Sequence, residues 1–172
     1  MNEKIVCLRY SSSLGAMVVS VNFKTKYSHK IFVYEPLRKL VVSHIRIAAI
    51  LNEKKYGIIL HEIGIFRDHI HLVFQFGPNI KLAKCISLFK QRSGYYAFQR
   101  FPWLKGRDQM NVLGRGTHQK LFCKGTFWSG AYYFDSVGED FDRKCDYARK
   151  QDSNEKNRRL SDYFDDSTMA LA

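Results

Sequence analysis

The chain has 172 residues, enough for one domain with a complete hydrophobic core. It has no apolar run long enough to cross a bilayer and no signal-peptide pattern at the N-terminus, so we expect a cytosolic protein without membrane contact. The four cysteines form no Cys-x-x-Cys pair, which argues against a structural zinc site and, in the cytosol, against disulfides. The formal charge of +12 is the strongest compositional signal, because a surplus of Lys and Arg attracts polyanions such as nucleic acid.

The apolar pattern predicts seven elements after residues 1–15, which look like a leader. Alternating Val-rich residues predict the first strand, and an apolar stripe behind Pro36 predicts the first helix. The predicted elements are a strand at 16–23, a helix at 35–55, strands at 57–66 and 69–76, a helix at 80–101, a last strand within 121–137 that is clearest at 126–134, and a helix from 139 to about 151. We expect a domain over 1–152 and a polar tail over 153–172.

This order of elements is the split β-α-β pattern of a ferredoxin-like sheet. We therefore expect an α+β protein with a ferredoxin-like (RRM-like) antiparallel sheet. Two helices should cover one face of the sheet, and an extra C-terminal helix should follow the last strand.

The second and third strands read as a hairpin, and the third carries His69-Ile70-His71. Side chains alternate along a strand, so both imidazoles lie on one face, where they can hold a metal ion. The register places Gly64 opposite His71, which would leave room for a bulky ligand. We expect His61 on the other face and leave it out of the site. By itself, a His-x-His pair is more often structural.

The last helix carries Tyr147 and Gln151, which share a face because they are four residues apart. Beside a metal held by His69 and His71, a tyrosine is a candidate nucleophile, although its phenol (pKa about 10) needs help to ionise. The ion would polarise a scissile phosphate, and the Gln151 oxygen would complete its coordination. Two nitrogens and one oxygen fit Mg²⁺ or Mn²⁺, and imidazole ligands leave Zn²⁺ open. A tyrosine at helical spacing is otherwise more often a packing residue.

Many of the cations are interleaved with aromatic residues in three stretches. Rings stack on unpaired bases while cations follow phosphates, so this mixture favours single-stranded nucleic acid, although it also occurs on ordinary helix surfaces. The stretches contain Lys90, Arg92, Tyr95 and Tyr96; Trp103, Lys105 and Arg107; and Lys120, Phe122, Lys124, Phe127 and Trp128.

Taken together, these motifs resemble the single-tyrosine HUH transposases of small insertion sequences that move as single-stranded DNA, including the REP-associated tyrosine transposases. Order and spacing agree from about Val18 to Gln151. The matching segments are Asp68-His69-Ile70-His71-Leu72-Val73, Leu88-Phe89-Lys90-Gln91-Arg92-Ser93, Phe127-Trp128-Ser129, Tyr132-Tyr133, Ser136-Val137-Gly138 and Tyr147 to Gln151.

The resemblance implies that Tyr147 attacks a phosphate in single-stranded DNA, giving a 5′-phosphotyrosine link and a free 3′-OH. It implies that His69, His71 and Gln151 bind the ion. It also implies recognition of DNA hairpins at the element's ends and a homodimer in which the tyrosine helix can complete the partner's site. The DNA contacts expected from the resemblance and the basic stretches are Lys90, Arg92, Lys105, Arg107, Lys120 and Trp128.

Two other functions fit the same sequence. One is a ferredoxin-like module that binds single-stranded DNA or RNA without catalysis, since this architecture hosts both enzymes and binding proteins. The other is a domesticated relative that uses the same chemistry on chromosomal repeats. The sequence does not specify the target hairpin, the cleavage position or whether the tyrosine helix acts within its own chain.

Overall fold

The computed structural model describes residues 8–10, 13–15, 17–105, 122, 125–138 and 140–156, with the backbone alone at 8–10, 13–14 and 151–156. Its centre is an antiparallel sheet in the order β4-β5-β3-β6. The strands are β3 (Met17–Lys24), β4 (Ile59–Ile65), β5 (His69–Phe76) and β6 (Tyr133–Ser136). The helices are α1 (Glu35–Tyr56), α2 (Leu82–Arg100) and α3 (Phe141–Lys156).

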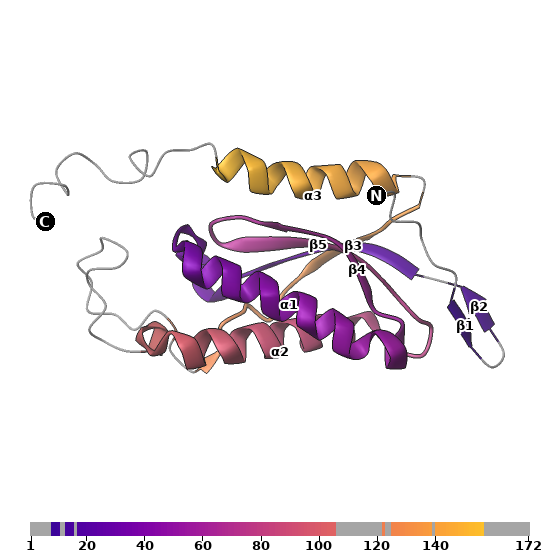
Figure 1. Cartoon of the computed structure of the whole chain (residues 1–172), viewed down its shortest axis with the longest axis horizontal. Coiled ribbons are helices and arrows are strands. Elements are labelled where there is room, and N and C mark those ends of the chain that lie inside the picture. Colours follow the sequence, from indigo (N-terminus) through magenta and orange to yellow (C-terminus); the bar gives the residue numbers. More distant parts are fainter. Residues whose placement is uncertain are drawn as a thin grey trace, which may run out of the picture.

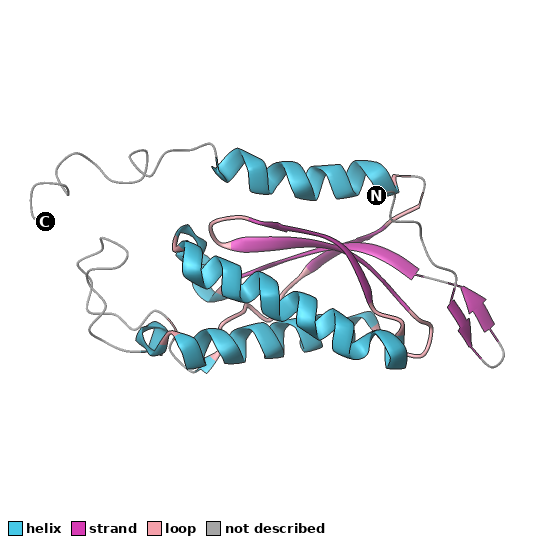
Figure 2. Cartoon of the chain, viewed as in Figure 1, coloured by secondary structure: helices cyan, strands magenta, loops and turns pink. Residues whose placement is uncertain are grey.

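The sheet separates two helical layers. Helices α1 and α2 cover one face, and α3 lies across the other (Figure 1). Figure 2 shows the same three layers as helix, strand and helix. The α+β, ferredoxin-like fold expected from the order of elements is therefore confirmed.

The main core fills the space between the sheet and helices α1 and α2. On α1, every third or fourth residue is buried, as the apolar stripe predicts. Gly57 ends the helix in the left-handed conformation at φ 64°, which a glycine adopts without strain. The core is built from residues such as Val21, Phe23, Leu37, Val41, Ile45, Leu72, Phe74, Ile86 and Phe89.

A second, smaller core lies between the sheet and α3. It contains Val18, Val73, Val137 and Cys145, with Phe141 packed against its edge. Cys145 is 8% exposed and acts here as a small apolar residue. This cluster holds α3 on the face of the sheet that carries the two histidines.

The N-terminal segment differs from the expected leader. It contains an antiparallel pair of short strands, β1 (Leu8–Tyr10) and β2 (Ser13–Gly15), which form a separate sheet. At the other end, α3 continues to Lys156, and residues 157–172 lie outside the described part. The domain boundary at 152 and the tail therefore stay predictions.

The last strand lies within the expected 121–137, but it is shorter than that range and begins later than residue 126, where the pattern is clearest. Phe127 and Trp128 are buried in the main core, so the chain there follows the end of β3 irregularly. The Nζ of Lys90 donates to the carbonyls of Ser129 at 2.8 Å and Ala131 at 3.1 Å, which holds this segment off the regular ladder. Regular pairing with β3 begins only at Tyr133.

Within the described residues, none of the helices combines the length and the apolar character that crossing a membrane requires.

Candidate active site

The two histidines of β5 lie together on the face that α3 covers. β5 pairs with β4 on one side and β3 on the other, which places His71 opposite both Gly64 and Asn22. The rings of His69 and His71 have centroids 5.1 Å apart. The expected Gly64–His71 register is thus present, and both imidazoles point to the same side of the sheet.

His69 is held in one orientation by its neighbours. Its Nδ1 lies 2.6 Å from Oδ1 of Asp68, and the Phe66 ring stacks on it with centroids 4.7 Å apart. In the tautomer whose Nδ1 donates to Asp68, the Nε2 lone pair is directed outward, as in histidines that bind metals. Asp68, in the connection between β4 and β5, is not among the site residues expected from the sequence. The signal that identifies it is a carboxylate directly before the first histidine of the pair.

His71 is a mostly buried imidazole whose surroundings favour its neutral form. Burial, and secondarily the charge of nearby His69, lowers its pKa to about 4. At neutral pH its ring therefore keeps a free nitrogen lone pair, which a metal ligand needs.

Tyr147 of α3 lies against this pair. Its ring centroid is 5.7 Å from that of His71, with the two planes 79° apart. Tyr147 is 56% exposed, so a strand in solution can reach it. The sequence therefore predicted two elements, 76 positions apart in the chain, that the fold brings side by side.

Gly64 fixes how closely α3 approaches the sheet. A Cβ at this position would clash with the carbonyl oxygen of Ala148, which is a backbone atom and can move only together with α3. The expectation that Gly64 leaves room for a ligand is wrong, because the backbone of α3 fills that space. The glycine instead lets Tyr147, next to Ala148, sit beside His71.

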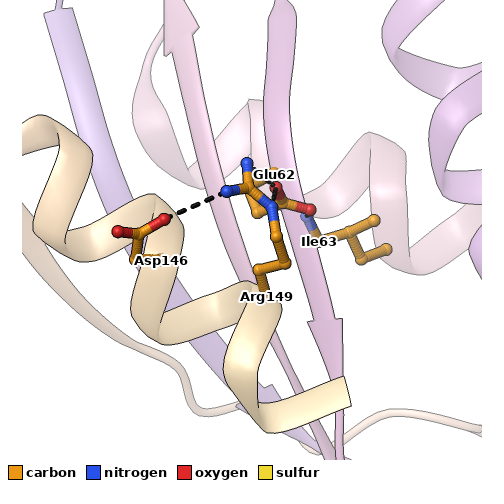
Figure 3. A network of polar contacts seen from close by, with 4 residues as sticks. All are labelled: Glu62, Ile63, Asp146 and Arg149. Atoms are coloured by element: carbon orange, nitrogen blue, oxygen red, sulfur yellow. Dashed lines mark hydrogen bonds and ion pairs between the residues drawn. The ribbon is translucent and has the colours of Figure 1, made fainter. Parts of the chain in front are cut away.

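Polar contacts tie α3 to the sheet on both sides. Nε of Arg149 donates to Oε2 of Glu62 at 3.0 Å, and its Nη1 donates to Asp146 at 3.0 Å (Figure 3). On the other side, Nζ of Lys144 donates to Asp135 of β6 at 2.8 Å. Exposed ion pairs contribute little stability each, so these pairs add only modestly to the apolar packing that holds α3 on the sheet.

His61 does not lie on the face expected for it. A register shift between Leu60 and Glu62 places it in an irregular part of β4. Its ring centroid is 5.0 Å from that of Phe141 on α3, so the ring contacts the α3 layer. The prediction failed because the alternation of faces holds only while the strand is regular.

The donors around His69 and His71 fit a divalent ion with an incomplete protein ligand set. One imidazole is oriented by a carboxylate and the other is neutral. Among the described residues, no group of three or more His, Cys, Asp or Glu side chains forms a metal site. Gln151 lies one helical turn after Tyr147, but only its backbone is described, so its role as third ligand stays a prediction.

Two of the expected DNA contacts have internal roles in this structure. Lys90 binds the 129–131 carbonyls and lies over the Phe23 ring at 4.9 Å, and burial lowers its pKa to about 8. Trp128 is 6% exposed, and its Nε1 donates to Oγ of Ser93 at 3.0 Å. Their contact with DNA stays a prediction that this conformation does not favour.

The other expected DNA contacts divide between an open groove and the undescribed part of the chain. Arg92 and Lys105 line a groove of about 900 Å³ between α2 and residues 125–132. The Arg92 guanidinium lies 5.0 Å above the Tyr96 ring. Arg107 and Lys120 lie outside the described residues.

Comparison with known proteins decides the family. Residues 14–151 match the family model of IS200-like transposases. The chain belongs to this family. The family is one of DNA-processing enzymes that generally depend on a metal. No curated protein matches the sequence.

Two solved structures of low sequence identity share the fold of this IS200-like transposase. One, from Deinococcus radiodurans R1, is described as a transposase; it has 19% identity and a TM-score of 0.59 and covers 84% of this chain and 97% of its own. The other is a REP-associated tyrosine transposase bound to a REP hairpin. It has 8% identity and a TM-score of 0.51 and covers 81% of this chain and 68% of its own.

Proposed function

We propose that this transposase cuts and rejoins single-stranded DNA through a covalent link to Tyr147. The observation that carries the proposal is the position of the Tyr147 ring, 5.7 Å from His71 and accessible from solution. A nucleophile and a pair of metal-ligating side chains in contact are what phosphoryl transfer to a tyrosine requires.

In this reaction the phenol oxygen of Tyr147 attacks phosphorus, and the bond from phosphorus to the 3′ oxygen breaks. The phenol releases its proton, and the leaving oxygen takes one up to become a 3′-OH. The phosphodiester is replaced by a 5′-phosphotyrosine ester, so the energy of the bond is kept. Attack by a different 3′-OH then rejoins DNA without ATP.

His69 and His71 would hold the Mg²⁺ or Mn²⁺ ion, with Gln151 as a third ligand. When bound, the ion supplies polarisation of the scissile phosphate and stabilises the charge that develops on it. Asp68 acts through His69, whose Nδ1 it holds at 2.6 Å. The side chains of this chain orient the ion and the nucleophile toward one another.

The substrate in this proposal is single-stranded DNA with hairpins at the ends of the element. A neighbour in fold is bound to a REP hairpin, and the charge of +12 suits a DNA partner. Arg92 and Lys105, in the groove beside α2, are the described cations best placed for such a contact. A homodimer remains part of the proposal.

A labelled single strand from the DNA that flanks the coding sequence tests the nucleophile. With Mn²⁺ or Mg²⁺, we expect label at the 3′ end to migrate with the protein on a denaturing gel. Label at the 5′ end should appear on a free fragment with a 3′-OH. Tyr147→Phe should lose the adduct. Tyr95→Phe is a matched control, because Tyr95 is 59% exposed and lies on α2.

Two outcomes would change the proposed function. Normal nicking by Tyr147→Phe would show that another group is the nucleophile. Tight binding of the strand by the unmodified chain, without a nick or adduct at any divalent ion tested, would leave a single-strand-binding module without catalysis.

A further inference from the structure

On the face of the sheet that carries His71 and Tyr147, the neighbouring strands β3 and β6 present three further side chains. We call Asn22, Lys24 and Tyr133 the strip. Asn22 lies opposite His71, and Tyr133 lies opposite Asn22. Directly opposite residues of antiparallel strands point to the same face, so both side chains lie on the side of Tyr147. Neighbouring strands are about 4.8 Å apart, so the backbone at Tyr133 is about 10 Å from that at His71.

The side chains of this strip have no partners of their own in the described part of the chain. Tyr133 is 65% exposed, and its ring contacts no other described aromatic ring. The Asn22 amide is half-buried yet makes no hydrogen bond with a described residue. Lys24 is exposed and lies opposite His69, one row along the same face.

This combination differs from the surroundings of the other tyrosines near the site. The Tyr132 ring packs near Phe134, and Lys90 lies 5.6 Å from it, whereas Tyr133 faces solvent on the histidine side. The paired strands β6 and β3 therefore present a flat ring on β6 and an unpaired amide and a free cation on β3, all on the face of the candidate nucleophile. An unpaired base offers a surface to stack, polar edges and a flanking phosphate, which match these three groups.

We propose that Tyr133, Asn22 and Lys24 form a binding platform for a nucleotide adjacent to the scissile phosphate. The base stacks on the Tyr133 ring, the Asn22 amide hydrogen-bonds to the base edge, and Lys24 contacts the neighbouring phosphate. The proposal rests on the proposed function for its location, because Tyr147 defines where the scissile phosphate lies. It adds the residues that position the strand and read the base beside the cut.

Photocross-linking tests the platform in a chain that cannot cleave. Two single-stranded oligonucleotides serve as probes, and each has one 5-iodouracil, placed before the mapped cleavage point in one and after it in the other. If no cleavage is found, the probe is oligo(dT) with one 5-iodouracil. The protein is the full chain with Tyr147→Phe. We expect the cross-linked peptide to contain Tyr133 for at least one probe.

Binding measurements separate stacking from a general effect on the fold. Tyr133→Ala should weaken binding of the same oligonucleotide between about five-fold and a hundred-fold, because a stacked base is lost. Tyr133→Phe should bind as the unsubstituted protein does, since the ring remains. With an abasic nucleotide at the cross-linking position, Tyr133→Ala and the unsubstituted protein should bind equally. Tyr27→Ala, a control at a tyrosine that is 58% exposed and does not line the groove of Arg92 and Lys105, should show no such dependence on the abasic nucleotide.

Lys24 and Asn22 have their own readouts. Lys24→Gln should reduce the slope of log affinity against log salt by about 0.7, the contribution of one phosphate contact in a single strand. Tyr133→Ala should leave that slope unchanged. Asn22→Ala should alter the preference among the four bases at the cross-linking position while Mn²⁺ affinity stays the same.

Several results would overturn the platform. Cross-links confined to residues other than Tyr133 would do so, as would an equal loss of binding by Tyr133→Ala on normal and abasic strands. A fall in Mn²⁺ affinity in Asn22→Ala would move Asn22 into the metal site. Cross-linking to Tyr133 without any adduct from the unsubstituted chain would reject cleavage but keep the platform. An adduct without this cross-link would reject the platform alone.

Discussion

At the scale of single residues, the contact between Asp68 and His69 gives the histidine pair its direction. An Nδ1 held at 2.6 Å by a carboxylate orients the ring and leaves the Nε2 lone pair open, as in histidines that bind metals. The neighbouring His71 has no carboxylate at such a distance in the described residues, and burial keeps it neutral instead. The two candidate ligands therefore differ in their surroundings: a carboxylate orients one, and burial keeps the other neutral.

Asp68→Asn should weaken Mn²⁺ binding by about 10- to 100-fold, the usual effect of removing such an outer partner. The measurement is calorimetric titration of the full chain with Mn²⁺.

His69→Ala and His71→Ala should abolish cleavage and leave hairpin binding nearly intact, because the phosphate and base contacts lie elsewhere.

Asp142→Asn serves as the control for the loss of one negative charge, because Asp142 is an exposed residue on α3. Equal metal affinity of Asp68→Asn and Asp142→Asn would remove Asp68 from the site. A parallel loss of DNA binding and cleavage in the histidine variants would count against their role as metal ligands.

The sequence predicted the histidines and the tyrosine at this scale but not the residues that position them. His69 and His71 follow from alternation along a strand, and Tyr147 from its helical spacing. Gly64 was placed correctly in register, but a sequence does not show which atoms fill the space above a glycine. In the structure these are the backbone atoms of Ala148.

At the scale of elements, α3 is seated on the sheet by a small apolar cluster and a close backbone contact. The cluster contains Cys145, and Ala148 is 1% exposed over Gly64. The ion pairs of Lys144 and Arg149 lie on either side of this contact. The contact between α3 and the sheet therefore leaves no room for a side chain at Gly64.

Gly64→Ala should displace α3 while the main core between the sheet, α1 and α2 stays folded. Overpacking of this kind costs about 1–3 kcal/mol. A shift of about 1 Å in the nucleophile lowers the rate of adduct formation about 100-fold. Adduct assays and hydrogen exchange of the α3 amides measure the two effects.

Gly138→Ala is the matched control, since a Cβ at Gly138 meets nothing within 4 Å. It should keep both adduct formation and the protection of α3. Unchanged adduct formation in Gly64→Ala would show that the seat does not determine the position of Tyr147.

The elements themselves followed from the sequence except where side chains overrode the pattern. β5 spans the expected residues, and α1 differs from its expected end by one residue. The alternation around 126–134 predicted a strand. In the structure the consecutive side chains of Phe127 and Trp128 are both buried in the core, whereas a regular strand would point them to opposite faces. Such tertiary packing is invisible to a local pattern.

At the scale of the whole molecule, one chain contains both halves of the candidate site. Tyr147 lies beside His71 of its own sheet, with α3 across the face opposite to α1 and α2 (Figure 1). The fold class followed from the order of elements, but the choice between a tyrosine serving its own sheet and one serving a partner did not. In this structure Tyr147 stays with its own sheet because the connection from β6 to α3 is short and because α3 packs against Gly64 of the same chain.

Co-expression of two inactive variants tests this arrangement. Tyr147→Phe retains the histidines, and His71→Ala retains the tyrosine, so each chain lacks a different half of the site. If α3 stays on its own sheet, the mixture should form no adduct, because every site lacks one group. If α3 moves to a partner, mixed dimers should regain complete sites and show part of the normal signal.

Co-expression of the unsubstituted chain with Tyr147→Phe controls for suppression by an inactive partner.

Gly64→Ala introduced into the His71→Ala chain then tests whether the packing of α3 prevents its exchange between chains. Because this substitution loosens the seat of α3, it should favour exchange if exchange can occur at all. An adduct that appears only with the loosened helix would show that the contact between Gly64 and Ala148 is what keeps Tyr147 on its own sheet. An adduct in the original mixture would contradict the arrangement in which each tyrosine serves its own chain.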